Sequence, residues 1–169
     1  LAAIGEYDKA ASSYRELLAR HPDRASLWMS YGHVLKTIGR LEESISAYRQ
    51  AIALDPGLGE AWWSLANLKT VTFSDADLAA MEAALAGPLS DADRLQLHFA
   101  LGKAHEDAGR YETAFGHYDQ GNALQRPRVD YAADETTGQM RRTKALLGRT
   151  FFAAHAGQGC QAPDPIFIL

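Results

Sequence analysis

Cysteine is almost absent from this chain, since Cys160 is the only one among 169 residues. A single cysteine excludes an internal disulfide framework. Long apolar runs are missing too, and no stretch reaches the roughly 18 residues from which a membrane-spanning helix is predicted. A signal peptide is also lacking. We therefore expect no membrane association and a cytoplasmic location.

Positive charge is scarce as well. The chain has 17 Lys and Arg against 21 Asp and Glu, a net charge of −4. Because nucleic-acid binding depends on clustered basic residues that neutralise phosphates, we expect no nucleic-acid partner. Basic residues gather only near the end of the chain, either as a docking face for an anionic partner or as a solvated helix face. These residues are Arg126, Arg128, Arg141, Arg142, Lys144 and Arg149.

Internal repetition is the main feature that the chain does have. Pro22 and Pro56 stand 34 residues apart, and Trp28 returns as Trp62 at the same spacing. A 34-residue period is typical of tetratricopeptide (TPR) repeats, helical hairpins that bury their apolar faces only by stacking on neighbours. The sequence therefore predicts an all-α chain of TPR-type hairpins, stacked as a right-handed superhelix without a sheet. Further pairs at this spacing are Gly5 and Gly39, Ala10 and Ser44, Tyr14 and Tyr48, and Tyr31 and Leu65.

The predicted repeats fill residues 1–127, and two of them are unusual. The first is partial, because only its second helix precedes Pro22; residues 1–4 would end the missing first helix, so we expect a piece of a longer protein. The third loses the pattern after Lys69, and a capping-box-like Ser74-x-x-Asp77 then starts a short helix. The fourth regains the register with two extra residues.

Two segments follow the repeats. Residues 128–157 are predicted to form one capping or linker helix, because a solenoid needs a terminal cap for solubility. Its apolar side would carry Met140, Leu146, Leu147, Phe151 and Phe152. Residues 158–169 form a tail that ends in consecutive large apolar residues, and such a segment favours self-association.

Catalytic and metal chemistry are not predicted. His98 and His105 share one helix face, but no Cys or His set supplies further metal ligands, and both are expected to be partly buried and hydrogen-bonded. His155 and Cys160 lack a residue that would orient a base. Residues 157–159 lack the strand and helix of a phosphate loop. We therefore assign no catalytic, cofactor-binding or metal-binding residue.

A binding groove is predicted on the inner face of the repeats, where the first helix of each hairpin lies. Trp63 is its most informative member, since Trp62 already fills the space between repeats and adjacent helix residues point about 100° apart. The alternative is that Trp63 packs on the long first helix of the fourth unit. A peptide or protein is the expected ligand. The groove residues are Met29, His33, Lys36, Thr37, Trp63, Asn67, Thr70, Val71, Phe99, Lys103, Glu106 and Asp107.

Several segments resemble one bacterial family. They are residues 61–70 (AWWSLANLKT), 73–75 (FSD), 97–104 (LHFALGKA), 106–109 (EDAG) and 121–124 (GNAL). Together they are similar to the N-terminal region of TPR-containing sulfotransferases. The closing residues 163–169 (PDPIFIL) resemble the first strand of the sulfotransferase domain.

In that family the strand leads into a Gly-x-Pro-Arg-Ser-Gly-Thr loop that holds 3′-phosphoadenylyl sulfate. This loop lies beyond Leu169, so the resemblance implies the cofactor only for a domain that the chain does not include. Three interpretations follow: a module that docks substrate for a downstream sulfotransferase, a part of its acceptor site, or a stand-alone scaffold or oligomerisation domain.

Overall fold

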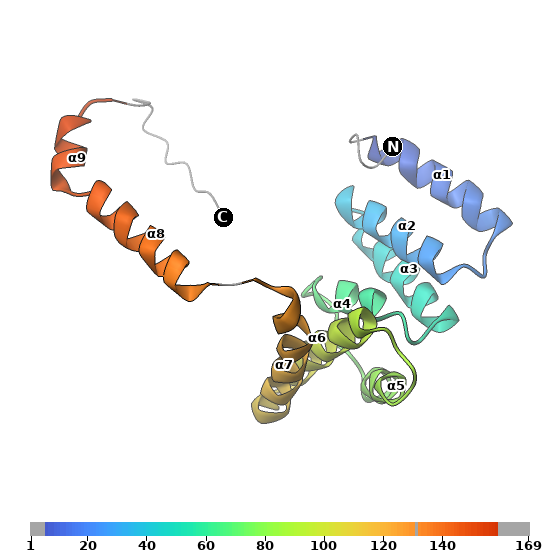
Figure 1. Ribbon diagram of the computed structural model, residues 1–169. Helices are drawn as coiled ribbons and strands as arrows, with labels where there is room; N and C mark the ends of the chain where they lie inside the picture. The colour runs from blue at the N-terminus through green and yellow to red at the C-terminus, as the bar shows by residue number, and fades with distance from the viewer. Residues whose placement is uncertain (1–5, 131, 159–169) are drawn as a thin grey trace. The chain divides into compact units, whose positions relative to one another are not determined.

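Helices are the regular elements of the chain in the computed structural model, which describes residues 6–130 and 132–158 (Figure 1). No strand occurs in these residues, so the predicted all-α class is confirmed. The residues fall into two units, Leu1–Arg128 and Val129–Leu169. The predicted helix end at residues 1–4 and the tail with Cys160 lie outside the described residues.

The first unit contains seven α-helices and a short 3-10 helix, as far as the structure describes it. They are α1 (Tyr7–Arg20), α2 (Ala25–Thr37), α3 (Leu41–Leu54), α4 (Gly59–Ala66), α5 (Asp75–Leu85), α6 (Asp91–Asp107), α7 (Tyr111–Gln125) and η2 (Arg126–Arg128). Figure 1 shows α2 beside α3 and α6 beside α7, the pairs expected of TPR hairpins.

The 34-residue repeat is visible in single hydrogen bonds. The indole Nε1–H of Trp28 donates to the carbonyl of Pro22 at 2.8 Å, and that of Trp62 donates to the carbonyl of Pro56 at 3.0 Å. Each indole thereby fixes the loop before its own helix, where Pro has ended the preceding one. The matched residues thus repeat because they make matched contacts.

The third repeat begins its two helices at the expected positions, but both helices are shorter than in the second repeat. Gly59 begins α4 34 residues after Ala25 begins α2, and Asp75 begins α5 34 residues after Leu41 begins α3. However, α4 has 8 residues against 13 in α2. The chain leaves α4 through Lys69, which has a φ of 60°. The predicted irregularity after Lys69 is confirmed, and it begins slightly earlier, at Asn67.

The packing of helices in the third repeat also differs from that of a standard hairpin. The short α4 packs mainly on α6, and the two helices meet at their first turns, where Gly59 N–H donates to Asp93 Oδ1 at 3.1 Å. The predicted caps are confirmed: Ser74 closes a capping box with Asp77, and Ser90 Oγ accepts from Asp93 N–H at 3.1 Å. The extra first turn of α6 makes it 17 residues long, as expected.

Helix α5 is attached to its neighbours by two arginines. Arg49 of α3 makes a two-pronged ion pair with Asp77, and its guanidinium lies 5.7 Å from the centre of the Phe73 ring. Arg94 of α6 donates to the carbonyls of Leu85 at 2.8 Å and Gly87 at 3.3 Å, at the end of α5. The bonds from Arg94 thus satisfy carbonyls at the C-terminal end of α5 that have no partner within the helix.

Two buried clusters form the core of the first unit. One joins α1, α2 and α3 around Leu18 and Leu35. The other joins α3 to α6 around Trp62, Met81 and Leu101, and all three side chains are almost completely buried. The candidate site on α4 and α6 is therefore carried by the second of these clusters.

The second unit corrects one expectation. In place of a single helix over 128–157 there are two, α8 (Ala133–Leu146) and α9 (Arg149–Ala154). Gly148 separates them in an extended conformation, with φ −85° and ψ 178°. Glycine has a low helix propensity, which favours a break at this point. The capping role of this segment stays a prediction. Among the described residues, no helix is long and apolar enough to cross a membrane.

Candidate peptide-binding face

Three aromatic rings line up on the first unit. Trp63 of α4 lies 5.6 Å from Phe99 of α6, and Phe99 lies 6.1 Å from Tyr118 of α7, measured between ring centres. All three side chains are half-buried. Rings at these separations attract one another in tilted geometries and keep one edge or face available. We call Trp63, Phe99 and Tyr118 the aromatic row.

Neighbouring residues determine where the aromatic row lies. Trp62 is 1% exposed and occupies the core, so Trp63, one position further along α4, points to a different side. Gly121 of α7 leaves space for Phe99, whose Cε2 would lie 3.3 Å from a Cβ at that position. Trp63 packs on Phe99 of α6, as the alternative expectation has it, and it also keeps an exposed portion; its role in binding a ligand stays a prediction.

Charged groups beside the aromatic row are paired with one another. Lys103 forms an ion pair with Asp107 one turn further along α6. The Tyr118 hydroxyl donates to Glu106 Oε2 at 2.7 Å. Burial raises the pKa of Tyr118, and so does the hydrogen bond that its hydroxyl donates to the Glu106 carboxylate. Tyr118 therefore remains a neutral donor, and Glu106 has a local partner.

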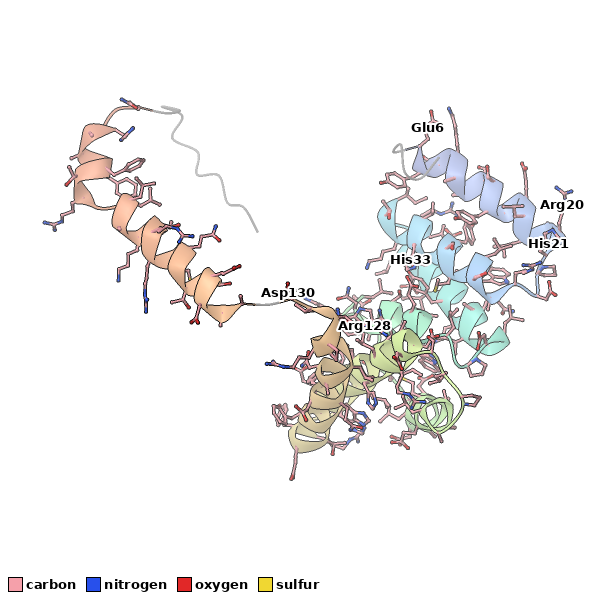
Figure 2. All side chains as sticks on the ribbon, viewed as in Figure 1. Glu6, Arg20, His21, His33, Arg128 and Asp130 are labelled. Atoms are coloured by element: carbon pink, nitrogen blue, oxygen red, sulfur yellow. The ribbon has the colours of Figure 1, made fainter. Side chains whose placement is uncertain are left out.

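His33, labelled in Figure 2, lies on α2, the first helix of the second repeat. Its Nδ1 is 2.9 Å from the Tyr48 hydroxyl of α3, and its Nε2 is 3.3 Å from Glu60 Oε1 of α4. Burial raises the pKa of Tyr48, so this phenol also stays neutral. His33 thereby links α2 to α4 across the predicted face.

The other predicted residues of α2 have different surroundings. Met29 is partly buried against the core cluster of α3 to α6. Thr37 donates to the carbonyl of His33 at 2.9 Å, within its own helix. Lys36 is exposed, and no ion pair involves it in the described part of the chain. Of these three, Lys36 is the one whose charge is available to a ligand.

The repeat pattern placed three further predicted residues on the first helix of the third repeat, but the structure places them after this helix. Asn67 is the exposed residue just after α4, Thr70 is exposed in the following loop, and Val71 packs against the core. The physical reason is that α4 stops at Ala66 and the chain turns at Lys69. The prediction that Thr70 and Val71 belong to this helix was wrong.

The structure also adds residues that the sequence did not suggest. Tyr118 and Glu60 were not among the predicted groove residues. A separate open cavity of about 510 Å³ lies between α2 and α3. It is lined by Trp28, Tyr31, Glu43, Ser46, Ala47 and Gln50, none of which was predicted as a groove residue.

No group of three or more His, Cys, Asp or Glu side chains in the described ranges is placed to hold a metal ion.

Comparisons with known proteins agree with the fold. Residues 1–59 match the tetratricopeptide repeat family. A solved structure titled "MamA RS-1 ArsTM double mutant" has a TM-score of 0.53 at 21% identity, over 78% of this chain and 72% of that one. Two further structures of MamA have TM-scores of 0.41 and 0.42 at 16% and 15% identity; they cover 77% and 78% of this chain, and 95% and 90% of their own. No curated protein matches the chain.

Residues 1–59 are therefore similar to TPR repeats, and repeats of this type are protein-interaction modules. The family match and the similar structures concern the repeats. The resemblance to sulfotransferases rests on the sequence segments quoted above.

Proposed function

We propose that the first unit binds an extended peptide, or a peptide segment of a protein, across α4 and α6 with Trp63 and Phe99 as anchors. The observation that carries this proposal is the half-buried aromatic row beside residues of the predicted groove. Aromatic side chains in partly desolvated positions provide a large share of binding energy at interfaces. Phe99, Lys103, Glu106 and Asp107 come from one helix, so a ligand would meet them together.

The chemistry of the ligand is inferred from the charges. Lys103, Glu106 and His33 already contact Asp107, Tyr118 and Glu60. A free carboxylate would have to displace these contacts, and Gln96 and Ala100 stand where a carboxylate clamp would need cations. We infer that the ligand contributes apolar or aromatic side chains, with Lys36 as an available cation, because it is exposed and has no ion pair among the described residues.

Peptides selected from a phage-displayed library of random dodecapeptides against the full chain test the proposal. The selected peptides are titrated by calorimetry into wild type, Trp63→Ala and Phe99→Ala. We expect each truncation to weaken binding by about 2 kcal/mol or more, a loss of roughly 30-fold. Phe115→Ala is the matched control, because Phe115 is 71% exposed on α7 and is not part of the aromatic row.

Two results would contradict this assignment. One is equal affinity of wild type and both truncated variants for every selected peptide. The other is a Trp63→Ala variant that loses much of its thermal stability without any effect on peptide affinity. That outcome would make Trp63 a core residue and nothing more.

We also propose that the chain docks substrate for a sulfotransferase domain that follows it in a longer protein. The support is the resemblance of residues 61–70, 97–104 and 163–169 to that family. Sequencing the gene beyond the codon for Leu169 tests it. A Gly-x-Pro-Arg-Ser-Gly-Thr motif directly after this codon is expected, and a stop codon would favour the stand-alone scaffold.

Self-association through the tail is a separate proposal that rests on sequence alone. Residues 166–169 are four consecutive large apolar residues, a composition that favours pairing with another chain. Deletion of residues 162–169 should lower the sedimentation coefficient at high protein concentration. If the deletion leaves the coefficient unchanged, the tail has no role in association.

A further inference from the structure

Three of the six histidines form a cluster between α6 and α7. His98 and His105 lie on α6, and His117 lies on α7. The Nδ1 atoms of His98 and His117 are 3.1 Å apart, and the rings of His105 and His117 stack with centres 5.4 Å apart and 7° between their planes. His98 and His105 are only 7% and 6% exposed. They were expected to be partly buried and hydrogen-bonded; the hydrogen bonds are confirmed, and the burial is deeper than expected.

The contact with Arg110 determines where the proton of His105 lies. Arg110 Nε donates to His105 Nδ1 at 2.8 Å. A guanidinium is always a donor in proteins, so this Nδ1 must keep its lone pair and the proton must be on Nε2. His105 Nε2 is buried without a hydrogen-bond partner. A second proton on this ring would break the bond to Arg110, so the observed geometry requires neutral His105.

The contact between His98 and His117 sets a second limit. Two Nδ1 atoms at 3.1 Å form a hydrogen bond only if one carries a proton and the other a lone pair. The two rings therefore cannot both be cationic while this bond exists. Together with neutral His105, the cluster tolerates at most one positive charge among its three imidazoles.

Surrounding charges add to this limit. Arg94 of α6 faces His98, Arg110 at the start of α7 faces His105, and Glu82 of α5 acts in the opposite sense on His105 and His117. Burial, followed by these like charges and the mutual repulsion of the imidazoles, lowers the pKa of His98, His105 and His117. One carboxylate does not compensate for two guanidiniums.

We propose that His98, His105 and His117 form an acid-sensitive latch that holds α7 on α6 when neutral and releases it when protonated. The pKa of each ring is lower in the folded chain than in the unfolded one. The resulting stabilisation is therefore complete above the unfolded value of about 6.5 and is lost as the pH falls below it toward the folded values.

Opening the latch has a consequence for the aromatic row. Phe99 and Tyr118 lie on the two helices that the histidines connect, so separation of α6 from α7 would pull these rings apart. A peptide bound there would be released in acid. This consequence rests on the function proposed above, whereas the latch itself does not.

Urea unfolding of the full chain between about pH 7.5 and pH 5 tests the latch. His117→Gln is the informative variant, because glutamine keeps a donor and an acceptor but does not titrate. We expect the loss of stability with acid to be smaller in His117→Gln than in wild type by roughly a third or more, since one of three linked protons is removed. His21→Gln, which removes an exposed histidine outside the cluster, should retain the wild-type slope.

Proton NMR titration of the wild-type imidazoles gives a second measurement that needs no variant. We expect three imidazoles to titrate below the ordinary value of about 6.5, and amides of 91–125 to exchange faster in acid than those of α2 and α3. Equal slopes for wild type and His117→Gln, or titration of the cluster at or above the ordinary value, would overturn the latch. Loss of peptide binding alone would leave it standing.

Discussion

Gly32 of α2 and Tyr48 of α3 touch so closely that a Cβ on Gly32 would lie 2.6 Å from Cε1 of the tyrosine ring. The fourth repeat has the same contact 70 residues later, where a Cβ on Gly102 would lie 2.5 Å from Cε1 of Tyr118. The small residue of each first helix is thus required by the aromatic residue of the second. The two contacts differ in one respect, since Tyr48 is fully buried and Tyr118 is half-buried.

Alanine at Gly32 should destabilise the chain by about 1–3 kcal/mol, because the buried Tyr48 ring has no room to move. The same change at Gly102 should cost less, since Tyr118 can shift toward solvent. Gly116 is the control: it lies on α7 with open space where a Cβ would lie, so alanine there should stabilise by about 0.5–1 kcal/mol. Urea unfolding gives all three values, and an equal effect at the three glycines would contradict this explanation.

Alanine at Gly59 should have a larger effect than at any of these glycines. A Cβ there would lie 2.8 Å from Asp93 Cα, and this neighbour is backbone. The helices α4 and α6 would have to separate, at a cost of about 3 kcal/mol or more. Since Trp63 and Phe99 belong to these helices, peptide binding should weaken too. Calorimetric titration of a selected peptide into Gly59→Ala, compared with Gly116→Ala, measures this loss.

The pairing of Asp77 with Arg49 makes α5 sensitive to acid. Burial alone would raise the pKa of Asp77, but hydrogen bonds from Arg49 and Ser74 outweigh it and lower that pKa. Its contribution to stability is therefore present above the ordinary carboxyl range and is lost as the pH falls through the lowered value. Asp77→Asn should cost about 1–2 kcal/mol near neutral pH, where the cap and the ion pair are both intact.

The cost of Asp77→Asn relative to wild type should shrink in acid, as measured by urea unfolding from neutral pH to about pH 3. Glu43→Gln is the control, because the Arg40–Glu43 pair lies on the surface within one helix turn. Surface pairs of this kind contribute little. A cost of Asp77→Asn that does not change with pH would mean that the cap, and not the charge, accounts for it.

Lys69 has a backbone conformation that favours glycine, with a φ of 60°. Lys69→Gly should therefore stabilise the chain slightly, by less than about 1 kcal/mol, because the strain relieved is offset by the greater freedom of glycine when unfolded. Gly39 is the reverse case, with a φ of 79° and open space around it. Gly39→Ala should destabilise by about 1 kcal/mol. Thermal unfolding of both variants checks the signs, and opposite signs from these would contradict the argument.

Repeat register was readable from the sequence because it depends on residues with strong local effects. Pro22 and Pro56 end helices, Ser74 and Ser90 begin them, and Trp62 is large enough to identify a core position. These effects act within a few residues, so their spacing gave the hairpins, the caps and the long α6. The break in the third repeat also had a local signal, since Lys69 is followed by three β-branched residues, Thr70, Val71 and Thr72.

The details of the site were less accessible, because they depend on pairing between distant segments. One example is the early end of α4 at Ala66, which leaves Thr70 and Val71 outside the helix while α4 packs on α6. His117 could not be linked to His98 from spacing alone, since the contact needs the crossing of α6 and α7. Tyr118 was not predicted as a groove residue for the same reason, although it completes the aromatic row.

Asp77 and Asp93 each stabilise the first turn of their own helix. Asp77 also forms an ion pair with Arg49 of α3, and Asp93 also accepts a hydrogen bond from Gly59 N–H of α4. The ends of helices commonly fray. Here the first turns of α5 and α6 cannot open unless a contact to an earlier helix breaks as well. Insertions or repeat duplications should consequently be tolerated at the α2–α3 turn but not at residues 74–93, where a change in chain length would detach two helices from the preceding repeat.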